Sequence, residues 1–166
     1  MLTFDSKGFL TPDRNLTSTL EEFQDEFVSK FPLQAKRQEL FNEFLRFLRD
    51  FFEAIGVEEI MIWANGSFVS NKESPNDIDF VFFLDSDLAD KFSDKISQQF
   101  THPESKTIYQ MDAFLLRNYA ETHPNHFFTQ SDKAYWFELF SRTRKNRQGN
   151  SDKKGFVELK IRRYEI

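Results

Sequence analysis

The spacing of apolar residues predicts two helices in the first third of the chain. Between residues 20 and 31 apolar side chains recur every three or four positions, and Pro32 ends the pattern. Ser18, with Glu21 three residues later, has the pattern of a capping box at the start of this helix. The preceding segment, Phe4–Leu10, is predicted to be a short extended arm.

A stronger helical pattern covers residues 35–55, and Gly56 supplies a C-terminal stop. A stripe with this period buries one helix face against a core, so we expect the aromatic residues here to be core residues. The stripe consists of Leu40, Phe41, Phe44, Leu45, Leu48, Phe51, Phe52 and Ile55.

After residue 56 short continuous apolar runs replace the helical spacing and predict buried strands. Four strands are expected, over residues 59–64, 78–84, 107–116 and 156–161. Helical spacing returns between them, over residues 86–100 and in a helix that Ser131 caps and that runs through Phe140. A short helix over Ser67–Lys72 is expected between the first two strands.

Helices that alternate with buried strands predict an α/β or α+β fold, with a small mixed sheet flanked by helices. The length of 166 residues predicts one domain over 1–166. We expect it to comprise a helical N-terminal part (1–56), a core (57–116) and a C-terminal part (117–166) with a helix, a basic segment and a strand.

Composition excludes several classes of site. The chain has 22 Phe and no Cys, so its core needs no disulfide, and cysteine nucleophiles and cysteine zinc sites are excluded. No apolar run approaches the roughly 18 residues of a membrane span, and the first ten residues do not resemble a secretion signal. We therefore expect a cytoplasmic protein with no membrane partner.

Charge is unevenly distributed. Between Ser141 and Arg163 nine Lys or Arg face only Asp152 and Glu158, a local formal charge of +7 that leaves −12 on the rest, since the whole chain carries −5. An acidic body with a basic C-terminal stretch indicates a local site for an anion, such as a polyphosphate or the end of a nucleic acid; a solvated charged face is the alternative.

Asp77 and Asp79 are the first candidate chemical groups. They lie two residues apart at the start of a predicted strand, so both side chains leave the same face. Two carboxylates about 4 Å apart repel each other by on the order of 4 kcal/mol at an effective dielectric near 20. A divalent hard cation such as Mg²⁺ would offset this repulsion. The alternative is a pair of ordinary acids at the wet end of the strand.

A glycine turn precedes this pair. Gly66-Ser67 follows a predicted strand, and glycine lets a backbone approach a phosphate closely. Nine residues separate Gly66-Ser67 from Asp77-Ile78-Asp79. This combination resembles the signature of the DNA polymerase beta nucleotidyltransferase superfamily. The start Phe4–Leu10, the stretch GSFVSNKESPNDIDFV and the late Lys154–Val157 are similar to a family of small bacterial nucleotidyltransferase-like proteins.

The resemblance implies a minimal nucleotidyltransferase fold in which Gly66 and Ser67 hold the triphosphate of a nucleotide. It implies that Asp77 and Asp79 ligate Mg²⁺ or Mn²⁺ and that a third carboxylate on a later strand completes the site. Asp112 is the preferred third carboxylate by strand order, and Glu158 is its rival. Asn65 departs from the superfamily, which often has an apolar residue before the glycine.

Further residues are weaker candidates. Lys72 lies between the two halves of the motif and is a candidate phosphate ligand, although an exposed turn lysine is the simpler interpretation. Lys154, Arg144 and Arg147 are also candidate phosphate ligands. Tyr135 or Trp136 could stack on a base. The three histidines, His102, His123 and His126, are expected on the surface, because they lack paired ligand spacing.

Three functions therefore stay open. The leading hypothesis is Mg²⁺-dependent transfer of a nucleotidyl group from an NTP to an acceptor hydroxyl of a protein or an RNA. The resemblance implies that such enzymes often act on a partner in bacterial toxin–antitoxin or anti-phage systems. The alternatives are a catalytically silent nucleotide- or partner-binding module with the same fold and an RNA-binding protein that uses the basic stretch.

Overall fold

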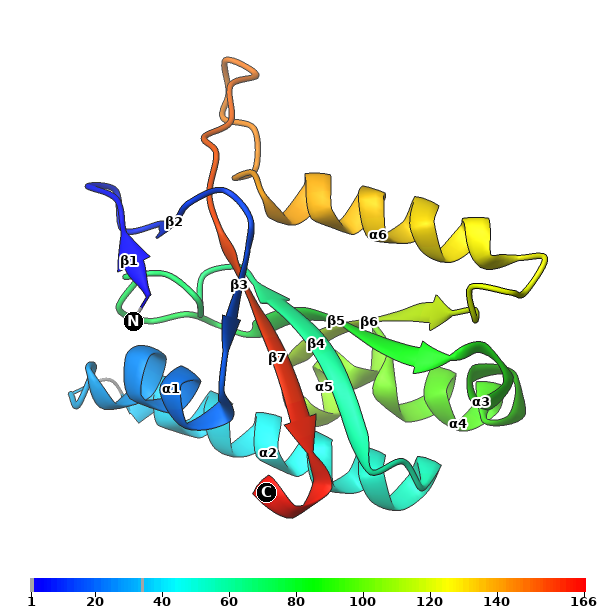
Figure 1. Cartoon of the computed structure of the whole chain (residues 1–166). Helices are drawn as coiled ribbons and strands as arrows, with labels where there is room; N and C mark the ends of the chain where they lie inside the picture. The colour runs from blue at the N-terminus through cyan, green and yellow to red at the C-terminus, as the bar shows by residue number, and fades with distance from the viewer. Residues whose placement is uncertain (1, 34) are drawn as a thin grey trace.

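The computed structural model describes residues 2–33 and 35–166 and has an α+β fold, which confirms the predicted class. A mixed five-stranded sheet has the strand order β3-β7-β4-β5-β6 (Figure 1). Its strands are β3 (Asn15–Ser18), β7 (Phe156–Arg162), β4 (Glu59–Asn65), β5 (Ile78–Asp85) and β6 (Met111–Asn118). A separate two-stranded hairpin joins β1 (Thr3–Phe4) and β2 (Leu10–Thr11).

Helices cover both faces of the large sheet. Figure 1 shows α1 and α2 on one face and α6 on the other. The helices are α1 (Leu20–Gln24, continued by a π-helical turn Asp25–Ser29), α2 (Ala35–Ile55), α3 (Ser86–Lys91), α4 (Ser93–Lys95, continued by a π-helical turn Ile96–Phe100), α5 (Glu104–Tyr109) and α6 (His126–Phe140), and a 3₁₀ turn follows at Arg163–Glu165. The sheet is thus sandwiched between two helical layers.

The larger core lies between the sheet and α2. The stripe predicted over residues 35–55 packs into this core. Phe47, a buried residue of α2 that the predicted stripe did not include, packs edge to face on Phe80 of β5, with ring centroids 5.1 Å apart. Edge-to-face aromatic pairs contribute about 0.5–1.5 kcal/mol beyond the burial of their area. The smaller core lies under α6, where Phe140 packs on Trp136 and Phe156. Both sheet faces are therefore apolar except where the polar site begins.

The strand pairings set the position of the site. β4 and β5 are antiparallel, with Asn65 opposite Asp79, whereas β5 and β6 are parallel, with Asp79 beside Asp112. β7 pairs antiparallel with β4 and parallel with β3. The three parts that the sequence suggested each contribute strands to one sheet, and residues 1–56, expected to be helical, also supply β1, β2 and β3.

Several local predictions differ from the structure. The capping box lies one residue later than predicted, because Thr19, not Ser18, accepts from the backbone N–H of Glu22 at 3.1 Å. The helix expected over 86–100 is interrupted at Phe92, which packs against the core. Residues 67–72 form turns rather than a helix.

The strand expected over 107–116 starts only at Met111. Thr107–Tyr109 belong to α5, which ends because Gln110 adopts a left-handed conformation (φ 61°). The helix expected to begin at Ser131 begins at His126. Its first turn is tied to β6, since the Thr129 hydroxyl donates to the carbonyl of Arg117 at 3.0 Å.

None of the helices in the described ranges is long and apolar enough to cross a membrane.

Candidate metal and nucleotide site

Three carboxylates converge where β5 and β6 begin. Asp77 immediately precedes β5, Asp79 lies on it, and the parallel register places Asp112 of β6 beside Asp79. Each offers an oxygen, and these oxygens lie within 4.8 Å of one another. The sequence predicted the shared face of Asp77 and Asp79, and the β5–β6 pairing adds Asp112. The set suits a hard divalent cation, which prefers carboxylate oxygens.

Gly66 lies directly against this cluster. Its φ of +79° favours glycine, and a Cβ placed there would be 1.9 Å from Oδ2 of Asp79. Any side chain at position 66 would thus displace the Asp79 carboxylate. The turn that follows β4 and the acid on β5 are in contact because Asn65 and Asp79 are opposite each other.

The carboxylates have different environments. Burial, together with the negative charges of Asp77 and Asp112, raises the pKa of Asp79 to about 6. Burial also acts to raise the pKa of Asp112, but hydrogen bonds from Lys106 and His102 outweigh it, and the pKa is lowered. Asp79 accepts no hydrogen bond from another described side chain, so it is the carboxylate with the strongest need for a cation.

Two further side chains, which sequence reasoning missed as site residues, contact the cluster. Lys106 of α5 donates to Oδ2 of Asp77 at 3.0 Å and to Oδ2 of Asp112 at 2.7 Å. These two hydrogen bonds, together with the negative charges of Asp77 and Asp112, raise the pKa of Lys106 above its ordinary value. His102, expected to be an ordinary surface histidine, is exposed, but its Nδ1 lies 2.8 Å from Oδ1 of Asp112. No sequence signal indicated either, because Lys106 was expected in a loop before a strand.

A buried arginine holds the turn after Gly66. Arg37 of α2 is completely buried, and its guanidinium donates to the carbonyls of Phe68 at 2.7 Å and Ser70 at 2.8 Å, and also to that of Lys72. A fourth bond reaches the carbonyl of Phe27 at 2.8 Å. Burial lowers the pKa of Arg37 to about 10. These bonds tie three carbonyls of the segment after Gly66 to α2 and so hold that segment in its turns.

The N-terminal hairpin packs against the same turn. Asp5 closes the hairpin by accepting from the backbone N–H of Lys7 at 2.8 Å and of Phe9 at 2.9 Å. The carbonyl of Gly8 then accepts from the N–H of Asn71 at 3.0 Å. The segment predicted to be an extended arm is thus a hairpin that supports the loop between Gly66 and Asp77.

The carboxylate cluster and the Gly66 turn line a cavity of about 1100 Å³. Gly66, Ser67, Lys72, Asp77, Asp79 and Asp112, the six predicted site residues, all line it. Its charged lining also includes Lys7, Lys106, Arg142, Arg144 and Lys154, so six basic side chains accompany three acidic ones. The cavity is therefore basic although the chain is acidic overall, which favours an anionic ligand.

Other predicted residues separate into two groups. Lys154, Arg144, Tyr135 and Trp136 line the cavity. Arg147 does not line it, and neither does Glu158, whose Oε2 accepts from Nε1 of Trp63 at 2.7 Å and from Nδ2 of Asn15 at 2.8 Å. The structure therefore places Asp112, and not Glu158, with the aspartate pair.

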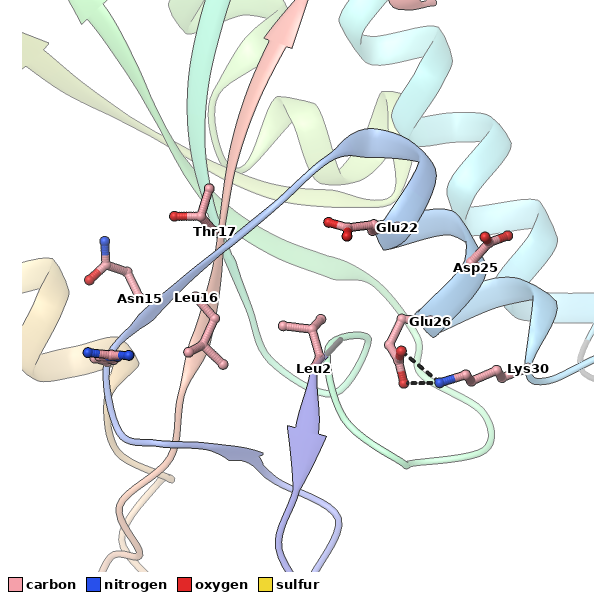
Figure 2. Close-up of a pocket in the computed structure, with 9 residues that line it drawn as sticks. Leu2, Asn15, Leu16, Thr17, Glu22, Asp25, Glu26 and Lys30 are labelled. Atoms are coloured by element: carbon pink, nitrogen blue, oxygen red, sulfur yellow. Dashed lines mark hydrogen bonds and ion pairs between the residues drawn. The ribbon is translucent and has the colours of Figure 1, made fainter.

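A second cavity, of about 700 Å³, lies between the edge strand β3 and the end of α1 (Figure 2). Figure 2 shows that Lys30 there forms an ion pair with Glu26, at 2.6 Å. None of the predicted site residues lines it. We therefore place the candidate site in the larger cavity.

Residues 2–160 match the model of a family described as a family of unknown function (DUF6932). No curated protein and no solved structure matches the chain.

Proposed function

We propose that the chain, which belongs to the family of unknown function DUF6932, is a Mg²⁺-dependent nucleotidyltransferase. It transfers an NMP group from an NTP to an acceptor hydroxyl on a protein or an RNA. The observation that carries the proposal is the convergence of Asp77, Asp79 and Asp112 beside the Gly66 turn, in a cavity that is otherwise basic. The setting we propose is the cytoplasm, in a toxin–antitoxin or anti-phage system.

The residues present fit Mg²⁺ or Mn²⁺. Three carboxylates supply oxygen ligands within 4.8 Å of one another, and Asp79 is a half-buried acid that accepts no hydrogen bond from a described cationic side chain. When bound, a divalent ion would neutralise charge on the transferring phosphoryl group and orient its oxygens. Asp77 and Asp79 would hold it. Asp112 would join them once Lys106 leaves its Oδ2.

The chain's own residues would position the reactants. Gly66 and Ser67 would hold the β- and γ-phosphates, with Lys72 at the rim. The acceptor oxygen would form a bond to the α-phosphorus while the bond from that phosphorus to the β-bridging oxygen breaks. Asp112 would take the proton of the acceptor hydroxyl, and pyrophosphate would leave. Phosphoryl transfer of this kind depends mainly on positioning and electrostatic stabilisation.

The decisive test is to incubate the protein with each α-labelled NTP, Mg²⁺ or Mn²⁺ and a cell lysate. Transfer predicts a labelled macromolecule and release of pyrophosphate. Digestion with ribonuclease or protease then identifies the acceptor class. Nucleotide binding with no pyrophosphate release from any NTP would contradict the proposal.

A catalytically silent nucleotide-binding module is the second candidate, and one observation favours it. Lys106 already supplies a cation to Asp77 and Asp112. This ammonium offsets part of the repulsion among the carboxylates that a metal ion would otherwise offset. The two candidates differ in the labelling experiment, because the module binds Mg-ATP without releasing pyrophosphate.

Removal of Lys106 is expected to tighten metal binding. In Lys106→Met the bridge between Asp77 and Asp112 is lost, so an incoming ion no longer competes with a resident ammonium. We expect the Kd for Mn²⁺ to fall about two- to fivefold, since Lys106 is partly exposed and such ion pairs contribute about 1 kcal/mol or less. Electron paramagnetic resonance of free Mn²⁺ measures this. Lys95→Met, an exposed lysine outside the cavity, is the control.

The raised pKa of Asp79 predicts a pH-dependent stability in metal-free buffer. A pKa of about 6 in the folded state and 3.8 as the ordinary value means that the folded chain binds this proton more tightly. Stability is therefore lost as pH rises from about 4 through 6. Asp79→Asn should exceed wild type at pH 7.5 by on the order of 1–3 kcal/mol, and the difference should vanish near pH 4. Urea unfolding with a chelator tests it; a difference that does not depend on pH would contradict it.

A further inference from the structure

Lys154 is unusual in this fold because its charged side chain is buried. Arg37 and Lys154 are the two charged side chains that are buried among the described residues, and Lys154 is 8% exposed. The two terminal nitrogens of Arg37 donate to four carbonyls, whereas the Lys154 ammonium donates to a single neutral acceptor, Oδ1 of Asn65. It forms no salt bridge with any described residue. An ammonium has three donors, so most of its hydrogen-bonding capacity is free.

The backbone around Lys154 keeps it buried. The N–H of Gly155 donates to the carbonyl of Leu10 at 2.6 Å, and a Cβ at position 155 would lie 2.5 Å from the carbonyl oxygen of Pro12. Glycine thus lets β7 enter directly beneath the N-terminal segment. The side chain of the preceding residue lines the cavity with Asn65.

A buried cation without a counter-ion costs free energy, so its retention calls for an anion that pairs with it. Burial lowers the pKa of Lys154 to about 8, and the Asp79 carboxylate opposes that shift. Asp79, however, belongs to the proposed metal cluster, where a divalent ion would neutralise it. Lys72 and Arg144 also line the cavity and form no salt bridge with a described residue.

We infer that Lys154 binds the phosphate chain of a polyphosphate ligand in the cavity that it lines with Asn65 and the Gly66-Ser67 turn. Arg144 lines the same cavity and adds positive charge. The inference deepens the proposed function, on which the nucleotide identity of the ligand rests. The anion site itself consists of protein groups, so it binds a phosphate chain without a divalent cation.

The test is calorimetric titration of the full chain with inorganic tripolyphosphate, with a chelator present and then with Mg²⁺. Lys154→Met keeps the length of the side chain and removes its charge. Lys153→Met is the matched control. The side chain of Lys153, next to Lys154 in the sequence, is 68% exposed, and its ammonium pairs with Asp13 outside the cavity. Circular dichroism shows whether each variant is folded.

We expect wild type to bind tripolyphosphate in the presence of chelator, and Lys154→Met to bind it about tenfold more weakly or worse, since hydrogen bonds to charged groups are the strong ones. Lys153→Met should stay within about twofold of wild type. Equal affinities of wild type and Lys154→Met overturn the inference, and so does a wild type that binds no tripolyphosphate. A Lys154-dependent site in a chain that never releases pyrophosphate supports the inference and rejects the proposed transfer.

Discussion

Asp77→Asn is expected to reduce nucleotidyl transfer by about a thousandfold or more while the chain stays folded. Asp77 is one of three oxygen donors to the proposed metal and has no part in either apolar core. Its one ion pair, with the partly exposed Lys106, contributes about 1 kcal/mol or less to stability. Loss of a metal ligand removes several kcal/mol of transition-state stabilisation, and each 1.36 kcal/mol is tenfold in rate. Release of pyrophosphate per unit time measures the effect.

The matched control is Asp94→Asn, which removes an exposed carboxylate of α4 outside the cavity. It should transfer at the wild-type rate and unfold at the wild-type temperature. If Asp77→Asn labels the acceptor as fast as wild type, the carboxylate cluster is not the catalytic site. If it fails to fold, Asp112→Asn tests the same cluster from another strand.

Arg37→Met is expected to have the largest effect on stability. The substitution leaves the carbonyls of Phe27, Phe68, Ser70 and Lys72 without the donor that now satisfies them. The guanidinium also lies 4.0 Å from the centre of the Phe31 ring. A buried polar group that loses its partner costs about 1–3 kcal/mol, so we expect a loss of about 3 kcal/mol or more in the free energy of unfolding. For a chain of this size that lowers Tm by about 6–12 °C.

Thermal unfolding followed by circular dichroism measures this loss, and Arg49→Met, an exposed arginine on the same helix, is the control. The control should change the free energy by less than about 0.5 kcal/mol. Because the carbonyls of Phe68, Ser70 and Lys72 belong to the loop after Gly66, Arg37→Met should also weaken tripolyphosphate binding. An Arg37→Met protein with wild-type Tm would show that the loop is held by other contacts.

The spacing of apolar residues was sufficient to predict an element where a single helical or strand period dominated the segment. The helix predicted over residues 35–55 has the same bounds as α2, because its stripe faces one core and Gly56 ends it. The two strands flanking the glycine turn were also predicted, with their aspartates on one face. Around Tyr109 the same reasoning failed, since its ring packs against Phe47 from a helix and its hydroxyl donates to Asp50 at 2.7 Å. Because the end of this short helix is buried, its apolar residues form a run with those of β6, and the run resembled a single strand.

The order of residues along the chain therefore determined the α+β class, the main helix and the carboxylate pair beside a glycine turn, because each depends on neighbours a few positions apart. Only the tertiary structure decided which groups surround that pair. Asp112 reaches it through a parallel strand pairing, and Lys106 comes from the helix before that strand. Lys154 lies just before the last strand, 89 residues beyond Asn65. Contacts of this kind depend on register and packing between distant segments, which no local period records.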